Sequence, residues 1–159
     1  MGLSVLVSQN GADPSAGPVL AIDYGRKRFG LAVSDALRLT ARPLATWSRS
    51  NRRRDLARLT SLCREQGIRL IVVGWPLRLD GTRGEMASEA ARFAERVRGE
   101  LGIPVELVDE RLSSWEAQWA LAETAARKPR SRSRKQGRLD EVAAAVILRD
   151  YLRRTGGTA

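Results

Sequence analysis

The chain has 159 residues, the size of one domain, which is enough to bury about 70% of the surface that the unfolded chain exposes. It contains no histidine, which excludes Ser-His-Asp catalysis, Cys-His catalysis and histidine metal sites. The formal net charge of +10 favours a polyanionic partner, although an arginine-rich composition set by genomic base content would give the same total.

The cysteine content and the termini indicate the compartment. The single cysteine, Cys63, cannot form an intramolecular disulfide, as is typical of a reducing compartment, and its place suits a small buried residue on a helix. No apolar run approaches the roughly 20 residues that span a bilayer, and the N-terminus lacks the pattern of a secretory signal. We therefore expect a cytoplasmic protein with a disordered extension at 1–18, one folded domain at 19–154 and a tail at 155–159.

The first part of the expected domain has the pattern of three strands. Apolar, partly β-branched runs predict buried strands at 19–22 and 29–33, joined by a tight hairpin at 24–28. A weaker strand at 41–47 contains Pro43, which favours the edge of a sheet. Short connections favour antiparallel pairing of these three strands.

Helices and strands alternate in the remainder. Asn51 is a suitable cap for a helix that ends near Gln66, before Gly67. The later segments are a strand at 70–74, a helix at 85–101, a strand at 105–108, a helix at 113–126, a basic loop at 127–138 and a last helix at 139–153. Strands joined through helices pair in parallel. The whole pattern predicts an α/β fold with a five-stranded mixed sheet flanked by helices.

Three acidic residues stand where the pattern predicts burial or half-burial. Asp23 ends the first apolar strand, Glu110 follows the strand at 105–108, and Asp140 begins the last helix beside its apolar stripe. Burial of an isolated charge is so costly that each needs a partner, and a cation is one such partner. The structural alternatives are a turn contact for Asp23, an ion pair for Glu110 and a favourable helix N-terminus for Asp140.

Meeting at one point, the three carboxylates would suit a hard, oxygen-binding cation such as Mg²⁺ or Mn²⁺. Two such ions about 4 Å apart favour in-line displacement at phosphorus, because one generates hydroxide from water and the other stabilises the leaving oxygen. This chemistry needs no histidine. We therefore predict that Asp23, Glu110 and Asp140 are the catalytic, metal-binding residues of a nuclease.

The last helix is expected to lie close to the sheet. Asp140 is followed at helical spacing by the apolar residues Ala144, Ile147 and Tyr151. Three consecutive alanines at 143–145 would let the helix backbone approach the strands closely.

Basic residues gather next to two of these carboxylates. Seven of the 28 Lys and Arg residues lie in the expected loop at 127–138, without one acidic residue among them. They are Arg127, Lys128, Arg130, Arg132, Arg134, Lys135 and Arg138. The hairpin after Asp23 adds Arg26, Lys27 and Arg28. We predict that both sets contact nucleic-acid phosphates; a solvated loop is the alternative for the first.

A third basic cluster, Arg49 and Arg52 to Arg54, opens the helix after Asn51 and is better interpreted as a solvated face. No pattern in the sequence is suited to reading bases, so recognition of phosphate and shape is expected.

Five ordered motifs resemble a known family. They are Ala21-Ile22-Asp23-Tyr24-Gly25, Gly30-Leu31-Ala32-Val33-Ser34-Asp35, Val73-Gly74-Trp75-Pro76-Leu77 with Asp80-Gly81, Val108-Asp109-Glu110-Arg111-Leu112-Ser113 and Asp140-Glu141-Val142-Ala143-Ala144-Ala145. Together they resemble the YqgF (RuvX) family, which is related to RuvC-type Holliday-junction resolvases, over about residues 19–153. Trp75 and Arg78 depart from the residues more usual in that family.

The resemblance implies a ribonuclease H-like fold with Asp23, Glu110 and Asp140 as the acidic positions. It also implies a role in trimming the 5′ end of pre-16S ribosomal RNA or, in the older proposal for such proteins, in resolving Holliday junctions. The expected partner is nucleic acid, structured RNA being favoured over a DNA junction, with ribosomal precursor particles as a further partner and no membrane.

Two other functions fit parts of the sequence. An actin-like or sugar-kinase-like ATPase uses the same fold but needs two such lobes to enclose the nucleotide, and 159 residues supply only one. Gly25 and Gly30 have the spacing of a Walker motif, but Leu31-Ala32 follows in place of Lys-Ser/Thr, which excludes a Walker site. A non-catalytic nucleic-acid-binding module in ribosome assembly or transcription would use the same basic loop, and only the acidic set argues against it.

Overall fold

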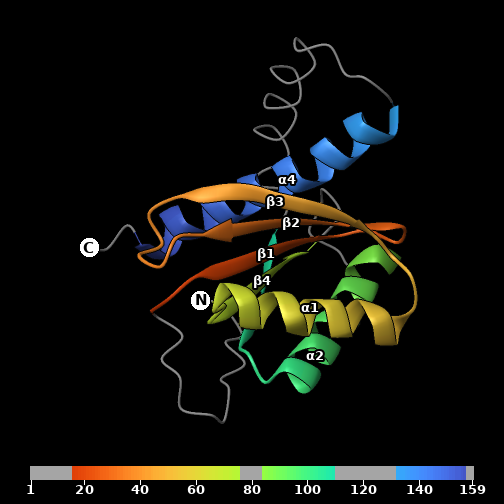
Figure 1. Cartoon of the computed structure of the whole chain (residues 1–159), viewed down its shortest axis with the longest axis horizontal. Helices are drawn as coiled ribbons and strands as arrows, with labels where there is room; N and C mark the ends of the chain where they lie inside the picture. The colour runs from red at the N-terminus through yellow and green to blue at the C-terminus, as the bar shows by residue number, and fades with distance from the viewer. Residues whose placement is uncertain (1–15, 76–83, 110–131, 157–159) are drawn as a thin grey trace.

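One sheet with helices on both faces forms the part of the chain that the computed structural model describes, residues 16–75, 84–109 and 132–156 (Figure 1). Its strands are β1 (Val19–Tyr24), β2 (Arg28–Ser34), β3 (Ala41–Ser48), β4 (Leu70–Trp75) and β5 (Val105–Asp109). The predicted helix at 113–126, and most of the predicted extension and tail, lie outside the described residues.

The strand order is β3-β2-β1-β4-β5, which puts the predicted edge strand with Pro43 at one side of the sheet. β1 pairs antiparallel with β2, and β2 pairs antiparallel with β3. β1, β4 and β5 are parallel. The predicted five-stranded mixed sheet is therefore confirmed. Since parallel strands end at the same edge, Asp23 near the end of β1 and Asp109 at the end of β5 lie toward one edge of the sheet.

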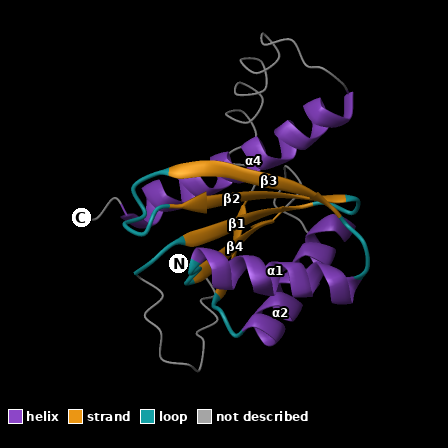
Figure 2. Cartoon of the chain, in the orientation of Figure 1, coloured by secondary structure: helices purple, strands orange, loops and turns teal. Residues whose placement is uncertain are grey.

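The helices α1 (Arg52–Gln66) and α2 (Glu85–Leu101) cover one face of the sheet, and α4 (Arg132–Gly156) covers the other (Figure 2). The predicted limits of α1 are confirmed: the Asn51 side chain accepts a hydrogen bond from the Arg54 amide, and Gly67 ends the helix in the left-handed conformation with φ 64°. None of the helices in the described ranges is apolar over a length that could cross a bilayer.

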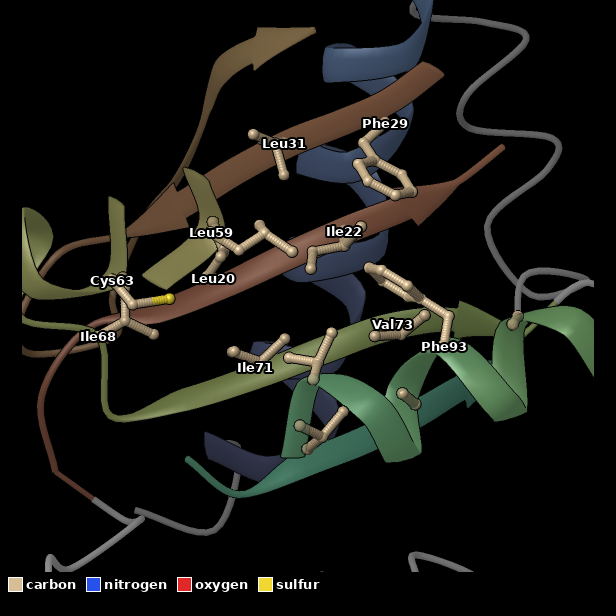
Figure 3. Close-up of a cluster of buried hydrophobic side chains, with 14 of the residues drawn as sticks. Leu20, Ile22, Phe29, Leu31, Leu59, Cys63, Ile68, Ile71, Val73 and Phe93 are labelled. Carbon is tan, nitrogen blue, oxygen red and sulfur yellow. The ribbon is translucent and has the colours of Figure 1, made fainter. Parts of the chain in front are cut away.

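Alternation along the strands divides the core between the two faces. Leu20 and Ile22 of β1 point toward α1 and α2, where they pack with side chains such as Leu59 and Phe93 (Figure 3). Val19 and Ala21 point the other way and belong to the core under α4. Asp23 continues this second set, so it faces α4.

The last helix is longer than predicted. α4 begins at Arg132, so the prediction of a loop at 127–138 is wrong from Arg132 onward, while 127–131 lie outside the described residues. Arg, Lys and Gln have high helix propensity and extend a packed helix despite their charge, and Gly137 costs only about 1 kcal/mol relative to alanine. Asp140 therefore lies inside the helix and not at its start, which removes the helix N-terminus as an explanation for this residue.

Candidate functional site

The backbone of α4 touches the sheet at Gly30. A Cβ atom built on Gly30 would lie only 3.0 Å from the Asp140 Cα and would overlap the Asp140 carbonyl group. Any other residue at this position would force the helix away from β2. A glycine inside a strand often marks such an approach, but the sequence does not show which element approaches Gly30.

The strand register places Asp23 beside this contact. Asp23 of β1 is paired directly with Gly30 of β2. Residues paired in this way send their side chains to the same face, with Cβ atoms about 5 Å apart. That face is the one covered by α4, whose backbone at Asp140 fills the space over Gly30. The structure thus brings Asp23 and Asp140 together from distant parts of the sequence.

The predicted apolar stripe after Asp140 holds α4 in this place. Ala144, Ile147 and Tyr151 are all buried in the core between α4 and the sheet. Burial raises the pKa of the Tyr151 hydroxyl, and its hydrogen bond with the buried Glu106 carboxyl raises that pKa further. The position of Asp140 is therefore set by packing along the helix that follows it.

Arg28 makes an ion pair with Asp140. The Arg28 Nε lies 2.8 Å from the Asp140 Oδ2, and the side chains are 36% and 24% exposed. An ion pair this exposed contributes at most about 1 kcal/mol to folding. Its main effect is therefore to place a positive charge on the carboxylate of Asp140, a residue whose backbone contacts the strand partner of Asp23.

Arg26 binds to α2, on the face of the sheet opposite to α4 and Asp140. Its guanidinium donates to both carboxylate oxygens of Glu89 on α2, with a shortest distance of 2.8 Å. This hydrogen bonding lowers the pKa of Glu89 from its ordinary value and raises the pKa of Arg26. The Tyr24 hydroxyl also donates to Glu89, at 3.5 Å. These contacts fix the hairpin that follows Asp23 on α2.

Arg49 stabilises the same hairpin from the side of β3. Its Nη1 donates to the Tyr24 hydroxyl at 3.1 Å and to the Gly25 carbonyl at 3.2 Å. Its guanidinium also lies over the rings of Tyr24 and Phe29, at 5.1 and 4.8 Å from their centroids. The interpretation as a solvated face is therefore wrong for Arg49, although Arg52, Arg53 and Arg54 are exposed.

The other predicted site residues are described in part or not at all. Glu110, which follows the last residue of β5, lies outside the described residues, as do Arg127, Lys128 and Arg130. Arg132, Arg134, Lys135 and Arg138 are in the first turns of α4, and only their backbone is described. Lys27 is exposed at the hairpin.

The residues at the Gly30 contact fit a divalent cation. Asp23 and Asp140 provide carboxylate oxygens, which Mg²⁺ and Mn²⁺ prefer as ligands, and Arg28 supplies a positive charge at Asp140. No group of three His, Cys, Asp or Glu residues within the described ranges could hold a metal. Asp23 and Asp140 would thus need a further ligand from elsewhere in the chain, such as Glu110.

Comparison with known proteins gives a family match over most of the chain. The RuvX family, described as Holliday junction resolvase, matches residues 17–154. A relative from Syntrophus aciditrophicus is 43% identical over 84% of this chain and 87% of its own length. One from Koribacter versatilis is 42% identical, with 91% and 93% of the two chains covered. Both relatives are provisionally named pre-16S rRNA nuclease.

A solved structure shows the same fold. RuvC from Thermus thermophilus, determined in complex with a Holliday junction substrate, superposes with a TM-score of 0.53 and 20% identity. The match covers 90% of this chain and 98% of that one. It confirms the predicted ribonuclease H-like architecture.

Proposed function

Because the chain belongs to the RuvX family, we propose that it is a metal-dependent nuclease that hydrolyses phosphodiester bonds of precursor 16S ribosomal RNA. The observation that carries the site is the contact between Gly30 and Asp140, because it brings a carboxylate of α4 beside Asp23. The names of the relatives support the substrate class. A protein that acts on this substrate would work in the cytoplasm, on ribosomal precursor particles.

Asp23, Asp140 and Glu110 would hold Mg²⁺ or Mn²⁺. Asp23 is fixed by the sheet, Asp140 by the packing of α4, and Glu110 follows directly on β5, whose end lies at the same edge as the end of β1. A bound cation lowers the pKa of a water molecule and stabilises the leaving oxygen. The carboxylates contribute ligands held at fixed positions, which lowers the reorganisation needed during the reaction.

Basic residues on both sides of the carboxylates would hold the RNA backbone. Lys27 and Arg28 lie on the hairpin, and the basic first turns of α4 precede Asp140 on the same helix. Figure 1 shows these turns, in light blue, rising away from the strands. A strand of RNA that contacts both groups would therefore pass over the carboxylates. Contacts with phosphate of this kind position nucleic acid without reading its sequence.

The test is cleavage of two substrates by the purified protein: precursor 16S rRNA with its 5′ extension, and a four-way DNA junction. We expect cleavage of the RNA that requires Mg²⁺ or Mn²⁺ and stops in EDTA. Asp23→Asn should bind the RNA and fail to cut it. Cleavage of the junction alone would indicate a resolvase, and RNA binding without cleavage in either ion would indicate a non-catalytic module.

A further inference from the structure

Arg28 has the longer and more exposed side chain in its ion pair with Asp140. The Asp140 backbone is fixed against Gly30, and its side chain is short. Arg28, in contrast, is at the first position of β2 and carries a long side chain that is 36% exposed. Only its Nε is hydrogen-bonded within the described part of the chain, so the terminal nitrogens are available to another acceptor. Separation of the pair would therefore occur by movement of Arg28.

The charges at this point favour such a movement. Without a cation, Arg28 offsets the repulsion between the neighbouring carboxylates of Asp23 and Asp140. A divalent cation would be held by the carboxylates, Asp140 among them, and its positive charge would repel the guanidinium of Arg28. Arg28 would then lie beside the cation with all its donors free, and a planar guanidinium is well suited to bind a phosphate through two hydrogen bonds.

We propose that Arg28 couples cation binding to RNA binding: it is held by Asp140 while no cation is bound, and it moves to a backbone phosphate when a cation takes that carboxylate. This rests on the proposed function and adds a positioning role for one residue. Two consequences follow. Arg28 contributes to RNA affinity only after Asp140 releases it, and it competes with the cation for Asp140, so it weakens cation binding.

The first consequence is tested in EDTA, where no cleavage occurs. Binding of a fluorescein-labelled RNA hairpin is measured by anisotropy, over a range of salt, for wild type, Arg28→Ala, Asp140→Ala and the double variant. Arg28→Ala alone should lower affinity only slightly, through the loss of one positive charge, and should leave the slope of log K against log salt unchanged. Asp140→Ala should bind several-fold more tightly, with a salt dependence of log K steeper by about one phosphate contact. Adding Arg28→Ala to Asp140→Ala should remove both effects.

The matched control is Asp23→Ala, which removes a neighbouring negative charge and is not the partner of Arg28. Any gain in affinity from this loss of charge should persist when Arg28→Ala is added. Circular dichroism of each variant checks that it is folded.

The second consequence is tested by titrating Mn²⁺ into the protein without RNA, with calorimetry as the readout. Arg28→Ala should bind Mn²⁺ several-fold more tightly than wild type. Unchanged or weaker Mn²⁺ binding by Arg28→Ala overturns the proposal, and so does a salt slope in EDTA that becomes shallower by about one phosphate contact in Arg28→Ala alone. Failure of the wild type to bind Mn²⁺ would instead overturn the proposed function and this coupling together.

Discussion

Gly30 of β2 and Asp140 of α4 are in backbone contact, with no room for a side chain between them. Asp23 pairs directly with Gly30, so this one contact sets the distance between a carboxylate on the sheet and a carboxylate on the helix. Divalent cations require ligands at nearly fixed distances. The activity of the protein should therefore depend on Gly30, although this residue has no side chain that could take part in the chemistry.

Gly30→Ala should reduce cleavage much more than it reduces stability. The added methyl group would overlap the Asp140 carbonyl and displace α4 from β2. Overpacking of this kind costs about 1–3 kcal/mol, which a folded domain tolerates, but a shift of α4 would disturb the spacing of the carboxylates. Mn²⁺ affinity and single-turnover cleavage, measured beside urea denaturation, check the prediction.

Gly99→Ala is the control for that variant. Gly99 lies in α2, and an added Cβ would meet nothing within 4 Å. The change should leave cleavage unchanged and stabilise the protein by about 0.5–1 kcal/mol, because alanine is the better helix former. Equal cleavage by Gly30→Ala and Gly99→Ala would show that the contact with α4 does not set the site.

Arg49→Ala should destabilise the protein by about 2 kcal/mol, because it removes an ion-pair partner from the buried Asp55. The Arg49 Nε lies 3.6 Å from Asp55 Oδ2, and the Asp55 side chain is almost inaccessible. Neither atom has a hydrogen-bond partner, so they depend on each other for charge balance. Thermal denaturation measures the loss. The exposed Arg52 is the matched control, and Arg52→Ala should stay within about 0.5 kcal/mol of wild type.

Local patterns were sufficient to predict most of the sheet. Apolar runs with β-branched residues identify β1 and β4, and the cap and stop residues of α1 lie at the positions observed. The packing of α4 also follows from a local pattern, since Ala144 and Ile147 share one side of a helix and both are buried. Asp140 could therefore be placed near the core from its own neighbours in the sequence.

Contacts between distant residues were not predictable in the same way. The Arg26 side chain binds Glu89, and the Arg28 side chain binds Asp140. These two residues and Lys27 between them are consecutive basic residues of one hairpin, so the local sequence does not distinguish them. Which acid each basic residue meets depends on the strand register and on the positions of α2 and α4. The start of α4 was missed for another reason: a run of charged helix-forming residues has the composition of a solvated loop as well as of an exposed helix.

The contact between Arg26 and Glu89 should stabilise the fold at neutral pH and less in acid. The pKa of Glu89 is lowered by the Arg26 hydrogen bonds from an ordinary value of 4.5, so the folded protein binds the proton less readily than the unfolded chain. The stabilisation is complete above pH 4.5 and disappears as the pH falls through the lower, folded pKa. Urea denaturation of wild type and Glu89→Gln across this range should show a difference that shrinks in acid; a constant difference would contradict the assignment.

Cys63 should resist alkylation in the folded protein. The thiol is buried in the core under α1, and burial raises its pKa to about 12. Since the thiolate is the reactive form, almost none is present at neutral pH. Iodoacetamide should therefore label the protein slowly in buffer and rapidly in urea, as followed by intact mass. Rapid labelling in buffer would mean that this part of the core opens frequently.

The basic first turns of α4 should bind phosphate without contributing to the fold. Replacing Arg132, Arg134, Lys135 and Arg138 together by Gln keeps the helix propensity and removes four positive charges. RNA affinity should fall, and the slope of log K against log salt should become shallower by up to about one for each residue that contacts a phosphate. The melting temperature should stay close to that of wild type. Four replacements by Gln at exposed arginines of α1, Arg52, Arg53, Arg54 and Arg64, change the net charge equally. A similar loss in both variants would therefore indicate an effect of total charge and not of a surface beside Asp140.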